Sequence, residues 1–340
     1  MPFDFPFAFE AHDMTLQLPL FARSRRAALG LAVAAAALCA APLAFAQGKA
    51  EPLRIGFQKY GTLTLLKAKG DLDKRLAAQG IEVRWSEFPA GPQMLEALNV
   101  GSIDFGTVGE APPIFAQAAG ADLVYVANQP PAPKGEAILV QKDSPLKTVA
   151  DLKGKKVALN KGSNVHYLLV KALEKAGVPY AAIQPVFLPP ADARAAFEKG
   201  AVDAWVIWDP FFAAAEKQLG ARVLADGTSL VSNHQFYLAS RGYADKHPQV
   251  IQAIVDELAR LDVWAEKSPK EVAALLAPQI GLPADITEVA AGRFAYGIRP
   301  ISPAVAAEQQ KIADAFFELK LIPKAIRISD ALPGKTVAAK

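Results

Sequence analysis

Glycine, hydroxyl and amide residues gather in loops that follow short apolar stretches, and their types and spacing could do chemistry. In the loop KGSNVH, Gly162 precedes Ser163 and Asn164 at the start of an apolar stretch with helical spacing. Glycine lets a backbone approach a ligand closely, whereas serine or asparagine at such a position often only caps the helix. The free N–H groups at a helix start carry partial positive charge. The loop could therefore hold an anion without a charged side chain.

Three more loops of this kind follow apolar stretches, at 58–62 (QKYGT), 108–111 (VGEA) and 208–211 (WDPF). In α/β proteins ligands bind beyond the carboxyl ends of the strands, where such loops lead into helices. QKYGT repeats the arrangement of KGSNVH less closely. Two helix starts that face each other across a cleft would suit a small anion with several acceptor oxygens.

The aromatic and charged side chains of these loops leave alternatives open. Trp208 is either half-buried core or an aromatic wall for an alkyl or aryl tail. Asp209 is first of all the cap of a helix that begins at Pro210, and its charge would oppose a nearby anion. Glu110 either holds a ligand amine or faces solvent.

The sequence contains no pattern typical of catalysis, a cofactor or a metal. GxSxG, the P-loop, GxGxxG and HExxH are absent, and the four histidines are too far apart for a local zinc motif. The one cysteine, Cys39, lies in an export signal, so the mature chain has no thiol. We therefore expect a binding protein and not an enzyme, with neither cofactor nor metal.

The N-terminus is typical of an export signal. A basic stretch (23–26) precedes an apolar stretch (27–41) and the small-residue sequence AFA. The alternative is a membrane anchor, but about 15 apolar residues fall short of the roughly 20 that a spanning helix needs. We predict a signal peptide over 1–46, cleaved after Ala46, with Met14 as an alternative start.

Length and net charge limit the kinds of protein that the mature chain can be. The 340 residues suffice for two lobes that each bury a core, and the net charge of +3 is spread along the chain. No basic block or basic amphipathic stripe points to nucleic acid or a membrane surface.

The elements that position the loops occur twice. Glycines and aspartates recur at separations of 99, 99 and 100 residues, in the pairs Gly101 with Gly200, Asp104 with Asp203, and Gly120 with Gly220. A pattern that repeats at a fixed offset indicates a duplicated unit. We expect two similar α/β lobes with a ligand cleft between them.

Strands and helices are expected to alternate in both halves. The strands are predicted at 54–57, 81–87, 103–105, 123–127, 156–159, 183–188, 202–207 and 222–225, with one at 234–240 that returns to the first lobe. The first helix is predicted at 63–76, and the last four at 248–267, 269–277, 283–291 and 303–320. These four are expected to pack on the first lobe and to contribute little chemistry.

The sequence resembles the periplasmic aliphatic-sulfonate-binding proteins of ABC importers. The resemblance rests on EFPAGPQMLEALNVGSID, PPIFAQAAGADLVYV, TVADLKGKKVALNKGSN, PADARAAFEKGAVDAWVIWDPFF and LIPKAI, and it covers nearly all of the mature chain. It implies a type II periplasmic-binding fold, with lobe one from 47–137 and 234–333, lobe two from 138–233, and a flexible tail at 334–340. It also implies a monomer that captures an alkanesulfonate in the periplasm and delivers it to an ABC permease.

The resemblance implies roles for individual residues. Gly162, Ser163 and Asn164 would hold the sulfonate, Gln58 and Tyr60 would lie opposite, and Trp208 and Asp209 would border the tail. The full set of expected ligand-binding residues is Gln58, Tyr60, Thr62, Gly109, Glu110, Gly162, Ser163, Asn164, His166, Trp208, Asp209 and Phe236. The sequence departs from the family at Glu110, at Asn164 with Val165, and at the added aromatic of QKYGT.

Other functions of the same fold remain as alternatives. Taurine, nitrate or bicarbonate, and pyrimidine-precursor binders share the fold and the importer role. A thiamine-pyrimidine-synthesis enzyme of this fold is associated with a cysteine- and histidine-rich motif, and the mature chain has no cysteine. Transcription regulators use the fold as an effector half, but here a signal peptide stands in place of DNA-binding helices.

Overall fold

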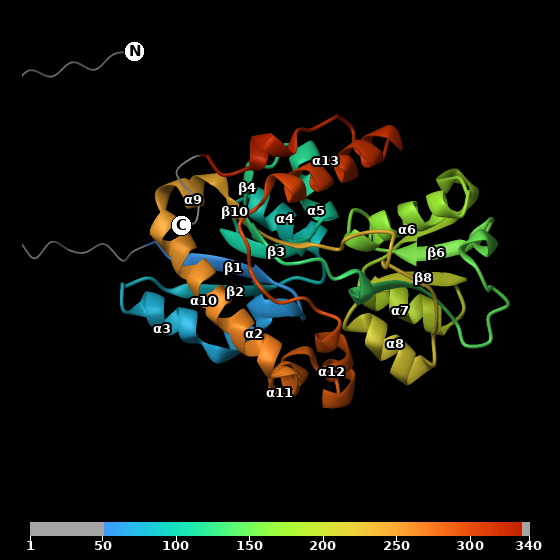
Figure 1. Cartoon of the computed structure of the whole chain (residues 1–340), viewed down its shortest axis with the longest axis horizontal. Helices are drawn as coiled ribbons and strands as arrows, with labels where there is room; N and C mark the ends of the chain where they lie inside the picture. The colour runs from blue at the N-terminus through green and yellow to red at the C-terminus, as the bar shows by residue number, and fades with distance from the viewer. Residues whose placement is uncertain (1–50, 335–340) are drawn as a thin grey trace, which may run out of the picture. The chain divides into compact units, whose positions relative to one another are not determined.

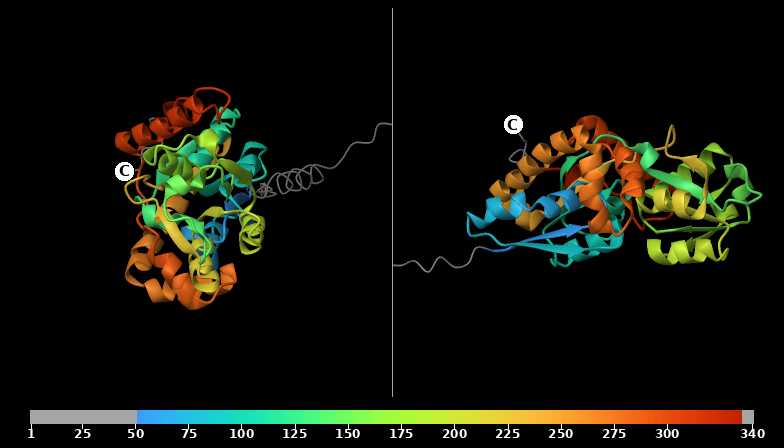
Figure 2. Two further views of the ribbon diagram at one scale, coloured as in Figure 1. Left: turned by 90° about the vertical axis from the view of Figure 1, so that its right-hand side faces the viewer. Right: turned by 90° about the horizontal axis from the view of Figure 1, so that it is seen from below.

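The described part of the chain, residues 51–334 of a computed structural model, has two lobes, each built on a five-stranded sheet (Figure 1). The signal peptide predicted over 1–46 lies outside the described residues, as does all but the first residue of the tail predicted at 334–340. The two lobes lie side by side along the long axis (Figure 2). Between residues 51 and 334 we find no helix with the length and apolar character needed to cross a membrane.

The sheet of lobe one has the strand order β2-β1-β3-β10-β4. Its strands are β1 (Leu53–Phe57), β2 (Val83–Glu87), β3 (Phe105–Gly109), β4 (Leu123–Asn128) and β10 (Gln235–Ser240). Strand β1 pairs in parallel with β2 and β3, whereas β10 runs antiparallel between β3 and β4. The predicted return of a late strand to the first lobe is therefore confirmed.

The helices of lobe one cover this sheet and come from both ends of the described chain. Before lobe two they are α2 (Gly61–Lys69), α3 (Asp71–Ala77), α4 (Gly91–Asn99) and α5 (Ala111–Ala118). After β10 they are α9 (Arg241–Lys246), α10 (Pro248–Lys267), α11 (Pro269–Ile280), α12 (Ala284–Gly292) and α13 (Pro303–Glu318).

Lobe two repeats the arrangement with the strand order β7-β6-β8-β5-β9. Its strands are β5 (Glu136–Val140), β6 (Lys156–Leu159), β7 (Gln184–Phe187), β8 (Ala204–Trp208) and β9 (Arg222–Asp226), and its helices are α6 (Asn164–Lys175), α7 (Pro190–Glu198) and α8 (Phe211–Leu219). The antiparallel strand here is β5, which enters from lobe one. Each lobe thus receives one strand across the connection between the lobes.

The duplication predicted from the sequence is confirmed by equivalent hydrogen bonds. Asp104 accepts the backbone N–H of Arg54 on its Oδ2 at 2.8 Å, and Asp203 accepts that of Lys156 in the same way at 2.8 Å. The carboxylate before β3 is therefore hydrogen-bonded to the start of β1, and the carboxylate before β8 to the start of β6. The paired glycines all have left-handed φ, with values of 71° at Gly101, 68° at Gly200, 94° at Gly120 and 62° at Gly220.

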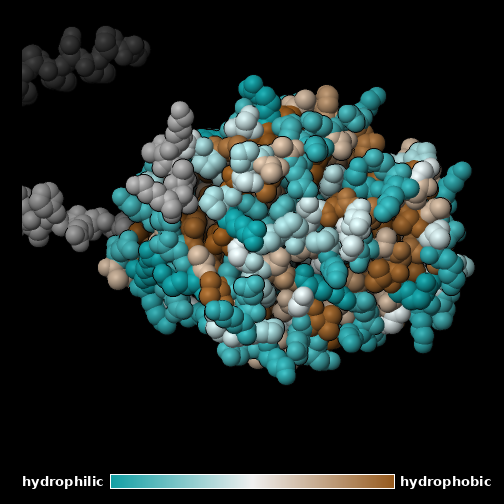
Figure 3. Space-filling model, in the orientation of Figure 1, coloured by the Kyte–Doolittle hydropathy of each residue, from teal (hydrophilic) through white to brown (hydrophobic). Residues whose placement is uncertain are grey.

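The burial of the strands follows their place in each sheet. All residues of β3 and β5 are buried, because helices cover both faces of a central strand, whereas the edge strand β2 has no buried residue. Hydrophilic residues cover most of the face of both lobes seen in Figure 3. The apolar side chains are thus turned into the lobes.

Several boundaries differ from the sequence-based expectation, and two of them bear on the loops beside the site. The helix predicted at 63–76 is broken into α2 and α3, because Gly70 adopts a left-handed φ of 69° and its N–H bonds to the carbonyl of Leu66. The strand predicted at 103–105 begins at Phe105 and continues to Gly109, so half of the loop predicted at 108–111 is strand.

The expectation that the last four helices pack only on lobe one is wrong for α12. Ala213 and Ala214 of α8, in lobe two, form a small buried cluster with Ile286 of α12. Figure 1 shows α12 next to α8. This helix therefore connects the C-terminal segment to the second lobe and brings its own side chains to the space between the lobes.

Candidate functional site

A pocket lies between the two lobes and is lined by polar residues from both. Seven of the expected residues line it: Gln58, Tyr60, Gly109, Ser163, Asn164, Trp208 and Asp209. The others do not line it. They are the buried residues Thr62, Glu110, Gly162, His166 and Phe236.

Lobe one contributes an amide and a phenol that hold each other in place. The Gln58 side chain donates from Nε2 to the carbonyl of Thr107 at 3.3 Å and to the Tyr60 hydroxyl at 3.4 Å. Tyr60 donates to Oε1 of Gln235, a residue of β10, at 2.9 Å. Burial raises the pKa of Tyr60 well above its usual value, so the hydroxyl stays protonated and neutral. Gln58, Tyr60 and Gln235 therefore give the lobe-one wall three uncharged hydrogen-bonding groups.

Lobe two contributes the start of α6. Gly162 has a left-handed φ of 75°, which turns the chain into the helix at Ser163. Ser163 does not cap the helix with its side chain, as had been expected of it or its neighbour, but donates from Oγ to the carbonyl of Asn160 at 2.7 Å. The first N–H groups of a helix have no partner within the helix. This start is therefore a place where an anion can be bound.

His166 shapes this loop from behind. Its Nδ1 accepts the N–H of Gly162 at 3.2 Å, and its Nε2 lies 2.8 Å from the hydroxyl of Tyr180. Because Nδ1 accepts, the proton resides on Nε2, which donates to the tyrosine. Burial lowers the pKa of His166 to about 4, so the ring is neutral near pH 7.

Asn164 crosses from lobe two to lobe one. Its Oδ1 accepts the N–H of Ala111, at the start of α5, at 3.3 Å, and its Nδ2 donates to Oδ1 of Asn233. Asn233 in turn donates to the carbonyl of Ala132 at 2.9 Å. The amide of Asn164 also lies directly against the Cα of Gly109, where a Cβ would come within 2.0 Å of it. The lobes can meet at this point only because residue 109 has no side chain.

Two buried carboxyl groups occupy equivalent positions of the duplicated lobes. Glu110 is only 1% exposed and accepts the N–H of His234 at 3.0 Å, so it does not face solvent. Asp209 accepts the N–H of Ala213, in the first turn of α8, at 2.9 Å, but α8 begins at Phe211 with Pro210 as its N-cap, so the predicted N-cap at Asp209 is wrong by one residue. Burial raises the pKa of Glu110 to about 8 and that of Asp209 to about 6, the latter against the opposing charge of Arg293.

Comparisons with known proteins identify the family of this chain. The model of the NMT1-like family matches residues 46–280. The chain belongs to the NMT1-like family. It is 52% identical over 286 residues to the aliphatic sulfonates-binding protein of Escherichia coli (strain K12), covering 83% of this chain and 89% of that protein.

Two solved structures are similar to this NMT1-like protein. One is the alkanesulfonate-binding protein SsuA from Xanthomonas axonopodis pv. citri bound to MOPS, with a TM-score of 0.80, 44% identity, and coverage of 84% of this chain and 98% of that one. The other is the periplasmic aliphatic sulphonate binding protein SsuA from Escherichia coli, with a TM-score of 0.74, 51% identity, and coverage of 83% and 97%. These relatives confirm the predicted type II periplasmic-binding fold. All three relatives are binding proteins, in agreement with the expectation of a binding protein and not an enzyme.

Nine further residues of the NMT1-like protein line the pocket and were not expected there. Among them are the hydrogen-bonding residues Asn233, Gln235 and Arg293 and the aromatic Phe294. Gln235 is the first residue of β10 and Asn233 shortly precedes it. This strand was predicted to return to lobe one, so the proximity of both residues to the pocket could have been inferred. Arg293 and Phe294 follow α12, and nothing in their local sequence signals a position between the lobes. The prediction that the C-terminal segment contributes little chemistry is wrong for these two residues.

Metal binding finds no support within the described residues. Across positions 51–334 no three histidine, cysteine, aspartate or glutamate side chains come together in a way that could hold a metal ion.

Proposed function

We propose that this protein captures an alkanesulfonate in the pocket between its lobes and hands it to an ABC permease for sulfur supply. The observation that carries the proposal is the lining itself, which combines neutral hydrogen-bonding groups from both lobes with the start of α6 and an indole. A sulfonate has three acceptor oxygens and one negative charge. Uncharged donors that converge from two sides can satisfy those oxygens.

In this proposal the sulfonate lies at the start of α6. Ser163 and Asn164 adjoin it from lobe two, and Gln58 and Tyr60 face it from lobe one. Gly162 and His166 fix the loop without lining the pocket, through the bond between the Gly162 N–H and the histidine ring. Thr62, Glu110 and Phe236 lie behind the wall of lobe one and hold its shape.

The alkyl tail extends past Trp208. A second hollow adjoins the pocket and shares Gln58, Tyr60 and Trp208 with it. Its remaining lining includes Phe88, Pro189, Pro190, Phe211 and Leu282. These apolar side chains from both lobes suit a hydrocarbon chain.

The proposal includes closure of the lobes over the ligand, with lobe one formed by 47–137 and 234–333 and lobe two by 138–233. A ligand that contacts both lobes favours the closed arrangement by its higher affinity for it. We further propose that the protein acts as a monomer in the periplasm, after cleavage of the signal peptide behind Ala46. The export of its relatives supports the location.

Thermal unfolding of refolded, ligand-free mature protein tests the ligand. The panel consists of short and long alkanesulfonates, an arylsulfonate, taurine, sulfate, nitrate and a pyrimidine. A ligand present at a thousand times its Kd adds about 4 kcal/mol to the free energy of unfolding, which raises the Tm by several degrees. A rise with alkanesulfonates supports the proposal. A rise only with taurine, nitrate or the pyrimidine contradicts the sulfonate assignment and leaves the importer role in place.

A further inference from the structure

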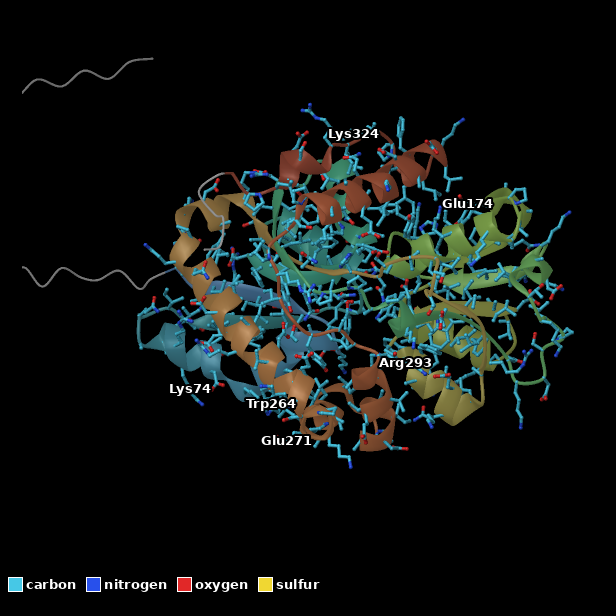
Figure 4. The ribbon with its side chains drawn as sticks, in the orientation of Figure 1. Lys74, Glu174, Trp264, Glu271, Arg293 and Lys324 are labelled. Atoms are coloured by element: carbon cyan, nitrogen blue, oxygen red, sulfur yellow. The ribbon has the colours of Figure 1, made fainter. Side chains whose placement is uncertain are left out.

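Arg293 comes from the C-terminal segment that follows α12, yet its guanidinium lies against lobe two (Figure 4). Its Nη2 lies 2.6 Å from Oε2 of Glu216, and its Cζ lies 3.9 Å from the centre of the Phe212 ring. Both partners belong to α8. The side chain is therefore fixed on two sides by one helix of lobe two.

The other terminal nitrogen of the guanidinium, Nη1, makes one long ion pair and no hydrogen bond in the described part of the chain. Nη1 is buried and has no hydrogen-bond partner within residues 51–334. Its ion-pair partner is Oδ2 of Asp209, at 3.5 Å, and this oxygen also has no hydrogen-bond partner there. Buried polar atoms without partners are uncommon and call for a bonding partner that comes from elsewhere.

Arg293 is also the one lysine or arginine among the described residues that line the pocket. Every other donor in the lining is an amide, an indole, a hydroxyl or a backbone N–H, and these groups carry only partial positive charge. A full positive charge adds to these groups a stronger preference for an anion over a neutral molecule of the same shape.

We propose that Arg293 is the residue that makes this pocket select an anion, by donating from Nη1 to an oxygen of the bound sulfonate. This inference rests on the proposed function and adds to it the residue that determines the selectivity of the pocket for anions. Asp209 competes with the ligand for the same nitrogen, so it moderates the affinity. Because the guanidinium is fixed on α8, this bond attaches the ligand to the side of lobe two opposite the start of α6.

The test compares a charged ligand with a neutral one of the same size. Binding of hexanesulfonate and of hexanesulfonamide is measured by titration calorimetry on the wild type, Arg293→Gln, Arg293→Lys and Asp209→Asn. Arg241→Gln is the matched control, because Arg241 is also partly buried and ion-paired, to Asp122 at 2.9 Å, but does not line the pocket. Thermal unfolding without ligand checks the folding of each variant.

We expect Arg293→Gln to lower the affinity for hexanesulfonate about 10- to 100-fold, the worth of a hydrogen bond to a charged group. Its affinity for the sulfonamide should change about twofold or less, and Arg293→Lys should recover part of the sulfonate affinity. Asp209→Asn keeps the acceptor for the Ala213 N–H, in the first turn of α8, and should bind the sulfonate several-fold more tightly. Arg241→Gln should bind as the wild type does.

Three results would overturn the inference. They are sulfonate binding by Arg293→Gln within about twofold of the wild type, an equal loss for the sulfonate and the sulfonamide, or an equal loss in Arg293→Gln and Arg293→Lys. The last two would mean that the side chain only supports the fold of the cleft. If instead the wild type binds no sulfonate, the proposed function itself fails, and this outcome is distinct from the other three.

Discussion

Replacing Gly109 by alanine should prevent the lobes from meeting at Asn164. The added Cβ would lie 2.0 Å from both the Nδ2 and the Oδ1 of Asn164, whereas ordinary contacts begin at about 3.4 Å. The backbone of residue 109 is ordinary strand, so alanine causes no strain there. The substitution therefore acts through the contact between the lobes and not through the fold of lobe one.

The cost follows from the bonds that Asn164 must give up. To make room, its amide has to retreat by about 1.4 Å, either by rotation of the side chain or by opening of the lobes. Both movements break its bonds to the N–H of Ala111 and to Asn233. Each bond contributes about 0.5–1.5 kcal/mol net. The closed arrangement should lose about 1–3 kcal/mol, which lowers the ligand affinity roughly 5- to 150-fold.

Titration calorimetry with hexanesulfonate measures the effect, and small-angle scattering with saturating ligand reports closure. Gly242→Ala is the control, because no atom lies within 4 Å of a Cβ at this position in α9. In an Asn164→Ala background the amide is gone, so Gly109→Ala should cost little more there. Wild-type affinity in Gly109→Ala, or the same loss in both backgrounds, would refute the steric account.

Three further predictions concern stability and specificity. Folding holds Glu110 in its neutral form, so the contribution of this group is complete below pH 4.5 and is lost as the pH rises to about 8. Urea titrations should therefore show the free energy of unfolding of the wild type falling relative to Glu110→Gln over that range, and parallel curves would contradict it. Trp208→Ala should lower the affinity for octanesulfonate about 5- to 30-fold and that for ethanesulfonate less, since the indole contacts the tail; calorimetry would disprove this if both ligands lost equally. Asp104→Ala should lower the free energy of unfolding, measured with urea, by about 2–4 kcal/mol, because it leaves the side chain and the backbone N–H of Arg54 without their acceptor. The equivalent Asp203→Ala removes an exposed carboxylate and should lower it by about 1 kcal/mol or less. Equal losses in the two variants would argue against the reasoning.

The duplicated part of the fold could be predicted from the sequence because its determinants are local. Glycines with left-handed φ follow the ends of α4, α5, α7 and α8, and an aspartate just before the next strand bonds to the neighbouring strand. These requirements leave the same residues at the same offset in both halves. The loops at the strand ends follow from this pattern, so the positions of Ser163, Asn164 and Trp208 at the pocket were accessible to sequence reasoning.

The rest depends on contacts between residues far apart in the chain. Arg293 reaches the pocket because α12 packs on α8. No pattern in the sequence of α12 indicates that α8 is the helix it packs against. The role of Gly109 depends on which side chain approaches it from the other lobe. His166 looked like a ligand-binding residue because it lies in the loop, but the fold turns its ring inward to the Gly162 N–H.

The most direct test of the central claim is a crystal structure of the mature protein with hexanesulfonate. The account predicts the sulfonate between the lobes at the start of α6, within hydrogen-bond distance of groups from both lobes, with the alkyl chain along Trp208. A sulfonate bound outside this pocket, or one held by groups of a single lobe, would contradict it.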